Sequence, residues 1–179
     1  MQIGYIDGPR LRRALIAGCH WAQLQRGELN RINVFPVPDG DTGTNLYLTV
    51  QAITDHLEQS TERSVGVVVQ EAAQAAVLGA RGNCGMMLSH FLLGFARSIE
   101  GRSRIGASDF GGALEAGVQN LSEALEAPVE GTILTVMRDA ARAVSSAQID
   151  DIAPLAEHML DRARCSLRRV SSMRERWDS

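Results

Sequence analysis

The stretch SVGVVVQEAAQAAVLG, residues 64–79, decides the fold class of this chain. Alanine is the strongest helix former, it dominates the second half of the stretch, and a glycine such as Gly79 commonly follows the last turn of a helix. The run Val67–Val69 is the only strand-like signal, and one short valine run followed by alanines is weak support for a sheet. The stretch therefore predicts a helix that Ser64 opens and that ends near Leu78.

The sequence on both sides of this stretch also has helical periodicity, because apolar residues recur three or four positions apart. Asp7 followed by Pro9 indicates the first helix start, and Ser108 and Asp151 are expected to cap two later helices. No repeat or linker divides the chain, so one domain over residues 1–179 is expected. The sequence predicts an all-α bundle of about seven helices, over residues 9–29, 46–57, 64–78, 86–99, 108–125, 133–144 and 151–170.

Composition limits the chemistry and the partners. The 179 residues have a net charge of −3, which argues against a nucleic-acid module held by a basic face. All 18 basic residues are arginine, so Schiff-base chemistry and the lysine-dependent phosphate loop are excluded. Any phosphate bound here must be met by a metal, by arginine or by backbone N–H groups.

The cysteines and the apolar stretches point to a compartment. Cys19, Cys84 and Cys165 are widely spaced and odd in number, which fits neither a disulfide framework nor a zinc site. The first residues lack a signal-peptide core, and the longest apolar stretch, residues 86–96, falls short of the ~20 residues that span a bilayer. We therefore expect a cytoplasmic protein with no membrane span.

The loop over residues 30–45 is the most informative segment for function. It contains Asp39-Gly40-Asp41 and leads directly into a helix. Carboxylates are the oxygen ligands that Mg²⁺ takes, and a glycine-rich loop at a helix N-terminus offers N–H groups to an anion. A surface turn is an equally good interpretation of the same residues, because Pro-Asp-Gly is a strong turn signal.

Two further loops also precede helices. Gly79-Ala80-Arg81-Gly82-Asn83-Cys84-Gly85 places a glycine at every third residue, and Val129-Glu130-Gly131-Thr132 comes before the helix at 133. Each loop alone could be a tight turn or a cap. In a bundle, however, the three loops could gather at one end and direct several helix N-termini at one polyphosphate.

Three segments, residues 33–45, 79–85 and 128–136, resemble the DhaL-type domain, the nucleotide-binding domain of dihydroxyacetone kinases. The N-terminal ATP-binding domain of bacterial fatty acid kinase is the most similar subgroup. The similarity runs from about Asp7 to about Val144. The resemblance implies an antiparallel, up-and-down helical barrel with the nucleotide at one end.

The resemblance also implies the site. Asp39 and Asp41 would be the catalytic, metal-binding carboxylates for Mg²⁺, with Asn33 at a third ligand position where glycerone kinases have Asp. Cys84 stands where Ser is usual in the family. The residues implied around ATP, or around a resident ADP rephosphorylated by a phosphocarrier, are Thr42, Gly43, Asn45, Gly82, Asn83, Cys84, Gly85 and Thr132.

The implied activity is phosphoryl transfer to dihydroxyacetone (glycerone) or to a fatty acid carboxylate. The acceptor would be presented by a partner, either a ketone-binding subunit or a fatty-acid-binding protein, and a second copy of the chain is a further candidate partner. The arginine-rich end, residues 161–179, departs from the family's glycine-rich capping loop and is expected to be a solvated, frayed end. The alternative function is therefore a catalytically silent nucleotide-binding or scaffolding domain.

Overall fold

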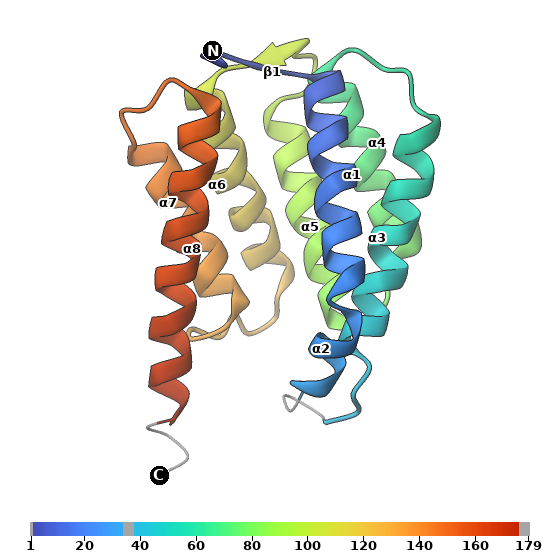
Figure 1. Ribbon diagram of the computed structural model, residues 1–179, viewed down its shortest axis with the longest axis vertical. Helices are drawn as coiled ribbons and strands as arrows, with labels where there is room; N and C mark the ends of the chain where they lie inside the picture. Colours follow the sequence, from blue (N-terminus) through green and yellow to red (C-terminus); the bar gives the residue numbers. More distant parts are fainter. Residues whose placement is uncertain (1, 34–37, 176–179) are drawn as a thin grey trace.

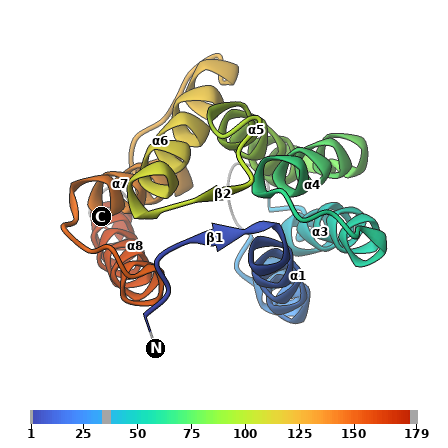
Figure 2. The same ribbon diagram turned by 90° about the horizontal axis from the view of Figure 1, so that it is seen from above.

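The computed structural model describes residues 2–33 and 38–175, and within these ranges the chain forms eight α-helices and one small sheet. The helices run up and down, and Figure 1 shows α2 and the α6–α7 connection at the same end. Figure 2 shows α1 and α3–α8 arranged in a ring, with the N-terminal segment crossing one end. The predicted all-α fold is confirmed. The elements are β1 Ile6–Asp7, α1 Gly8–Leu24, α2 Arg26–Arg31, α3 Thr42–Gln59, α4 Val65–Gly79, α5 Gly82–Ser98, β2 Arg104–Ile105, α6 Ala107–Ala124, α7 Ile133–Ser146 and α8 Ile152–Glu175.

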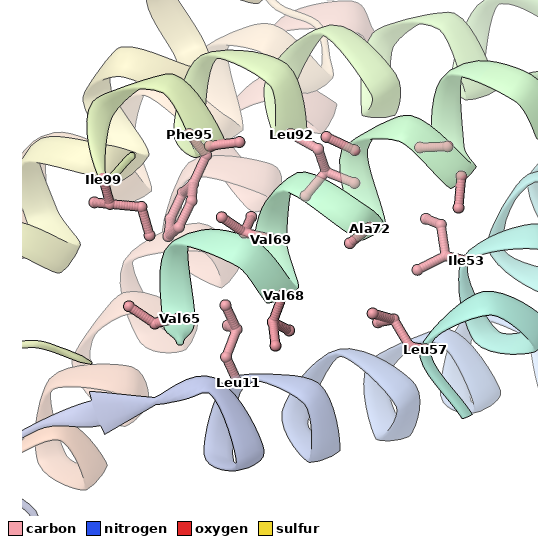
Figure 3. Close-up of a cluster of buried hydrophobic side chains, with 14 of the residues drawn as sticks. Leu11, Ile53, Leu57, Val65, Val68, Val69, Ala72, Leu92, Phe95 and Ile99 are labelled. Carbon is pink, nitrogen blue, oxygen red and sulfur yellow. The ribbon is translucent and has the colours of Figure 1, made fainter. Parts of the chain in front are cut away.

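Helix α4 is the centre of the core, and the valine run belongs to it. Val65 and Val68 are fully buried, and Figure 3 shows them beside Leu11 of α1 and Leu57 of α3. Alanines on the same helix keep α3 and α5 close to it, since Ala72 and Ala76 are also fully buried. Val69 is buried as well, whereas Val67 is 37% exposed on the outer face of the helix. Packing of the buried valines outweighs the small loss of helix propensity, which explains why a β-branched run is tolerated here.

The helix starts agree with the sequence in part. Asp7 caps α1 by accepting the Arg10 N–H at 2.9 Å, as expected. The expected Ser108 cap is wrong, because Gly106 is the N-cap of α6 and its N–H donates to the Asp109 carboxylate at 3.3 Å. The single helix expected over 9–29 is also wrong, because the Gln25 N–H bonds to Ala22 three residues back and separates α1 from α2.

Two elements lay outside the sequence expectations. Strands β1 and β2 pair antiparallel, with Ile6 opposite Ile105. Each has only two residues, too few for a period to be visible.

The arginine-rich end is ordered helix as far as the structure describes it. Helix α8 continues to Glu175, which confirms the helix predicted over residues 151–170, so the expectation of fraying is wrong up to Glu175. Ser166 and Val170 are buried, whereas most other residues of 161–172 are exposed, as expected for a solvated end. The expectation for residues 176–179 falls outside the described residues. No helix in the described part of the chain combines the length and the apolar character needed to cross a bilayer.

Candidate nucleotide and metal site

The first loop holds its two carboxylates at the start of α3. The Asn33 side-chain nitrogen donates to Asp39 Oδ1 at 2.6 Å, and Thr42 Oγ1 donates to Asn33 Oδ1 at 2.8 Å. Asp41 is the N-cap residue of α3 but makes no side-chain cap hydrogen bond, and both aspartates are exposed. The carboxylates are therefore positioned at a helix N-terminus while remaining open to a ligand. Residues 34–37, part of the segment that carries the family resemblance, lie outside the described residues.

Helix α2 braces this loop. The two atoms of the Asn30 side-chain amide bond to Thr44, accepting its N–H at 3.0 Å and donating to its Oγ1 at 3.0 Å. Gly43 is buried, and a Cβ there would collide with the backbone carbonyl of Arg26. Gly43 thus permits α2 to pack against the first turn of α3, and it does not line the cleft described below.

The second loop is fastened to α3 by a buried threonine. Thr49 Oγ1 accepts the Arg81 N–H at 3.1 Å and donates to the Asn45 carbonyl at 2.8 Å. Gly82 has φ +58°, and its Cβ position would lie 2.7 Å from Asn45 Nδ2. Gly85 is buried against Thr49, so it also serves packing rather than the cleft wall. These contacts set the N-terminus of α5 beside that of α3.

Cys84, in the second loop, interacts with two residues of the first loop. Its thiol lies 3.6 Å from the Thr42 carbonyl oxygen, to which it is a donor. Burial raises the pKa of the Cys84 thiol, and the charge of Asp41 raises it further. The thiol therefore stays protonated and acts as a weak hydrogen-bond donor, not as a nucleophile or a soft metal ligand.

The third loop is held by the contacts of two of its side chains, Thr132 and Glu130. Thr132 is the N-cap of α7 and accepts the Leu134 N–H at 3.3 Å, while its hydroxyl donates to the Val129 carbonyl at 2.7 Å. Glu130 accepts from Thr135 Oγ1 at 2.7 Å and pairs with Arg138, and these partners lower the pKa of the Glu130 carboxyl. The capping interpretation of Thr132 is thus confirmed, and the same residue faces the cleft.

The three loops enclose one cleft of about 650 Å³. All the site residues expected from the sequence line it, except Gly43 and Gly85. Most of the apolar half of the wall was not expected from the sequence; for Met86 and Met87, at the start of an apolar helix, the sequence favours the core and leaves contact with a nucleobase as the alternative. Apolar residues at helix ends carry no pattern that distinguishes a cleft wall from a core. The apolar lining consists of Met86, Met87, Leu125, Ala127, Val129 and Ile133.

The polar half of the cleft suits a hard cation together with an anion. The N-termini of α3, α5 and α7 meet there, and each carries a partial positive charge and unpaired N–H groups. Asp39 and Asp41 add two carboxylates, and no group of three or more His, Cys, Asp or Glu forms a metal cluster among the described residues. Two carboxylates with amide and hydroxyl oxygens fit Mg²⁺, which commonly takes its remaining ligands from phosphate and water.

Comparison with known proteins identifies the family. The model of the DAK2 domain matches residues 36–177. This chain belongs to the DAK2 domain family. The DAK2 domain is kinase-associated and nucleotide-binding, which confirms the resemblance to the DhaL type, and the match includes the arginine-rich end that we had set apart.

The curated relatives are longer proteins from Bacillus and Staphylococcus species. This DAK2 domain is 37% identical over 175 residues to protein YloV of Bacillus subtilis, covering 97% of this chain and 32% of YloV. It is 36% identical over 167 residues to an uncharacterized protein of Staphylococcus epidermidis, covering 92% of this chain and 30% of that protein. The chain thus spans about a third of the length of these relatives.

Proposed function

We propose that this DAK2 domain binds Mg²⁺·ATP in the cleft and transfers a phosphoryl group to a small acceptor presented by a partner subunit. One observation carries the proposal: the cleft places Asp39 and Asp41 beside the N-termini of three helices. The carboxylates repel a bare triphosphate, whereas the helix N-termini attract it. A divalent cation held by the carboxylates would offset their repulsion of the triphosphate, so that the carboxylates and the helix N-termini would both favour binding.

The residues of the chain have separable tasks in this proposal. Asp39 and Asp41 would hold the cation, which when bound would neutralise phosphate charge during transfer. Asn33 keeps Asp39 in place through its amide nitrogen, and it stands at the third ligand position that the family resemblance implies. The N–H groups at the starts of α5 and α7 would bind phosphate oxygens without reorganisation.

The apolar half of the cleft provides a place for the nucleobase. Met86 and Met87 stand on the first turns of α5, directly after the proposed phosphate-binding loop. Flexible thioethers pack well against aromatic rings. The nucleotide would therefore lie with its phosphates at Gly82–Cys84 and its base against the methionines.

The acceptor is proposed to come from a partner because the cleft offers little acid–base chemistry of its own. Its described lining contains no His, Glu or Tyr, and the only titrating groups besides Cys84 are the two aspartates. Those aspartates are assigned to the metal. Glycerone or a fatty acid carboxylate, held by a ketone-binding subunit or a fatty-acid-binding protein, remains the proposed acceptor.

A second candidate function is a nucleotide-binding domain without turnover. The observation that favours it is the composition of the last third of the chain, which has no glycine after Gly131 and hence no glycine-rich capping loop. Helix α8 passes through this region without interruption up to Glu175. Turnover of ATP with and without candidate acceptor-binding proteins separates the two candidates, since the silent domain binds nucleotide and hydrolyses none in every combination.

Calorimetry tests the proposed site itself. We expect Asp39→Asn and Asp41→Asn each to abolish the Mg²⁺-dependent part of nucleotide affinity while the helical circular dichroism is unchanged. Asp55→Asn is the matched control, because Asp55 is an exposed aspartate on α3 that bonds to Gln51 and lies outside the cleft. Equal nucleotide affinity in all three variants would refute the metal site.

A further inference from the structure

A second concave surface lies between α7 and α8 and is rich in arginine. The hollow has a volume of about 440 Å³ and is lined by Arg142, Arg162 and Arg169, together with Asp139 and Ser166. Figure 2 shows α7 and α8 together on the side of the ring opposite α3 and α4. No residue that lines this hollow also lines the nucleotide cleft, so the two are distinct.

Part of this charge is already neutralised, and the rest is free. The buried Ser166 hydroxyl donates to Asp139 Oδ2 at 2.5 Å, and Arg169 pairs with the same oxygen. Asp139 is thus held in a fixed position and offsets the charge of Arg169. Arg142 and Arg162 line the open hollow and make no side-chain hydrogen bond or ion pair with residues in the described ranges, although the charge of Arg142 helps to lower the pKa of the Glu130 carboxyl.

The excess of arginine does not extend across α7. A neighbouring hollow of about 420 Å³ between α6 and α7 shares Arg142, but its other charged residues are Arg138, which is paired with Glu130, and Glu115. Residues four apart on a helix are separated by about 6 Å along its axis, and residues seven apart, as Arg162 and Arg169 are, by about 10 Å. The charges are therefore spread along two helices rather than converging on one point.

This distribution indicates the kind of ligand. Helices α7 and α8 begin at Ile133 and Ile152, outside the hollow, so no helix N-terminus adds N–H groups to it. A single phosphate is usually bound by converging donors of that type. Carboxylates spaced along a peptide match separated arginines better. The net charge of the chain is −3, so the arginines of this hollow are a local positive charge that favours an acidic partner.

We propose that the hollow around Arg142 and Arg162 is a docking surface for an acidic segment of a partner protein. The segment contacts both free guanidinium groups through Asp or Glu side chains and lies along the groove between α7 and α8. Docking there leaves the nucleotide cleft open. The proposal does not depend on phosphoryl transfer.

The test measures binding of a fluorescent ten-residue glutamate peptide to the full chain at low ionic strength, by anisotropy. We expect the double variant Arg142→Glu, Arg162→Glu to bind at least about tenfold more weakly than the native chain. The matched control is Arg13→Glu with Arg63→Glu, two exposed arginines on α1 and before α4, which change the net charge equally. The control should bind within about threefold of the native chain.

Three outcomes would overturn the proposal. One is an equal loss in both double variants, which indicates a general charge effect. Another is a native chain that does not bind the peptide at all. The third is displacement of the peptide by inorganic phosphate as effectively as by unlabelled peptide, which indicates a phosphate site. The affinity for Mg²⁺·ADP is measured in parallel and should be unchanged in both double variants, whatever the fate of the phosphotransferase proposal.

Discussion

Replacing Gly82 with alanine separates the geometry of the cleft from the stability of the fold. Gly82 has φ +58°, a left-handed conformation that costs a residue with a Cβ roughly 1–2 kcal/mol. A Cβ at this position would also lie 2.7 Å from Asn45 Nδ2 and 3.2 Å from its Cγ, where ordinary van der Waals contact begins at 3.4 Å. Asn45 lines the cleft, so its displacement alters the ligand-binding wall.

The control is Gly101→Ala. Gly101 has φ +73° and nothing within 4 Å of its Cβ position, so alanine there has the backbone cost without the collision. Both variants should lose about 1–2 kcal/mol of unfolding free energy, which for a chain of this size lowers the melting temperature by about 2–8 °C. Thermal unfolding followed by circular dichroism measures this loss.

Only the Gly82 variant should lose nucleotide affinity. A displacement approaching 1 Å in a positioning group can reduce function up to about a hundredfold, and we expect Gly82→Ala to weaken Mg²⁺·ADP binding by about tenfold or more. Gly101→Ala should bind like the native chain in the same calorimetric titration. If the two variants bind nucleotide equally well, Gly82 and Asn45 do not form a wall of the nucleotide site and the reasoning is wrong.

Three other perturbations follow from the contacts between the loops. Thr49→Val removes the acceptor of the half-buried Arg81 N–H and should cost about 1–3 kcal/mol of unfolding free energy and weaken nucleotide binding. Thr54→Val should leave binding intact, because the Thr54 hydroxyl bonds to Val50 and Cys19, away from the loops. Equal binding by both variants would contradict the role of Thr49 in fastening the second loop to α3. Because burial and Asp41 raise the pKa of the Cys84 thiol, iodoacetamide should label the exposed Cys165 before Cys84. Asp41→Asn should increase the rate at which Cys84 is labelled, measured by peptide mass spectrometry. An unchanged rate would place Asp41 away from the thiol. Thr135 and Arg138 lower the pKa of Glu130, so its stabilising effect is present above about pH 4 and disappears as the pH falls through the lowered value. Because the Glu130 side chain is 65% exposed, this contribution to the free energy of unfolding is about 0.2–1 kcal/mol. In urea unfolding, Glu130→Gln should be less stable than the native chain at pH 7 and equally stable at pH 3. A loss of stability that is the same at both pH values would mean that the charge of Glu130 does not contribute.

The sequence was sufficient for the helices whose ends have a local chemical cause. Asp7 and Thr132 cap their helices through their own side chains, so short-range rules located both starts. The break at Gln25 arises from backbone geometry, which leaves no residue signature, and the start of α6 depends on Asp109, three residues after the Gly106 cap, rather than on Ser108. Strand β1 exists only because β2, almost a hundred residues away, lies beside it.

The polar half of the cleft was also predictable, and the apolar half was not. Acidic, glycine and asparagine residues in loops carry a chemical meaning that does not depend on the fold. Leu125 and Ile133, by contrast, follow the same helical spacing as residues in the core, and only the packing of α6 against α7 turns them toward the cleft. Gly43 and Gly85 show the opposite error: both stand in motifs typical of ligand-binding loops, but both are buried and are required for helix packing rather than for the cleft wall.

The central claim is that one metal–nucleotide complex is bound by three helix N-termini and two carboxylates. Paramagnetic relaxation tests it most directly, with Mn²⁺ replacing Mg²⁺ in a ¹⁵N-labelled sample that contains ADP. The expected result is strong broadening of the amide signals at the starts of α3, α5 and α7 together, with the signals of the distant β1 and β2 strands unaffected. Broadening confined to the Asp39–Asp41 turn, or absent from all three helix starts, would contradict the account.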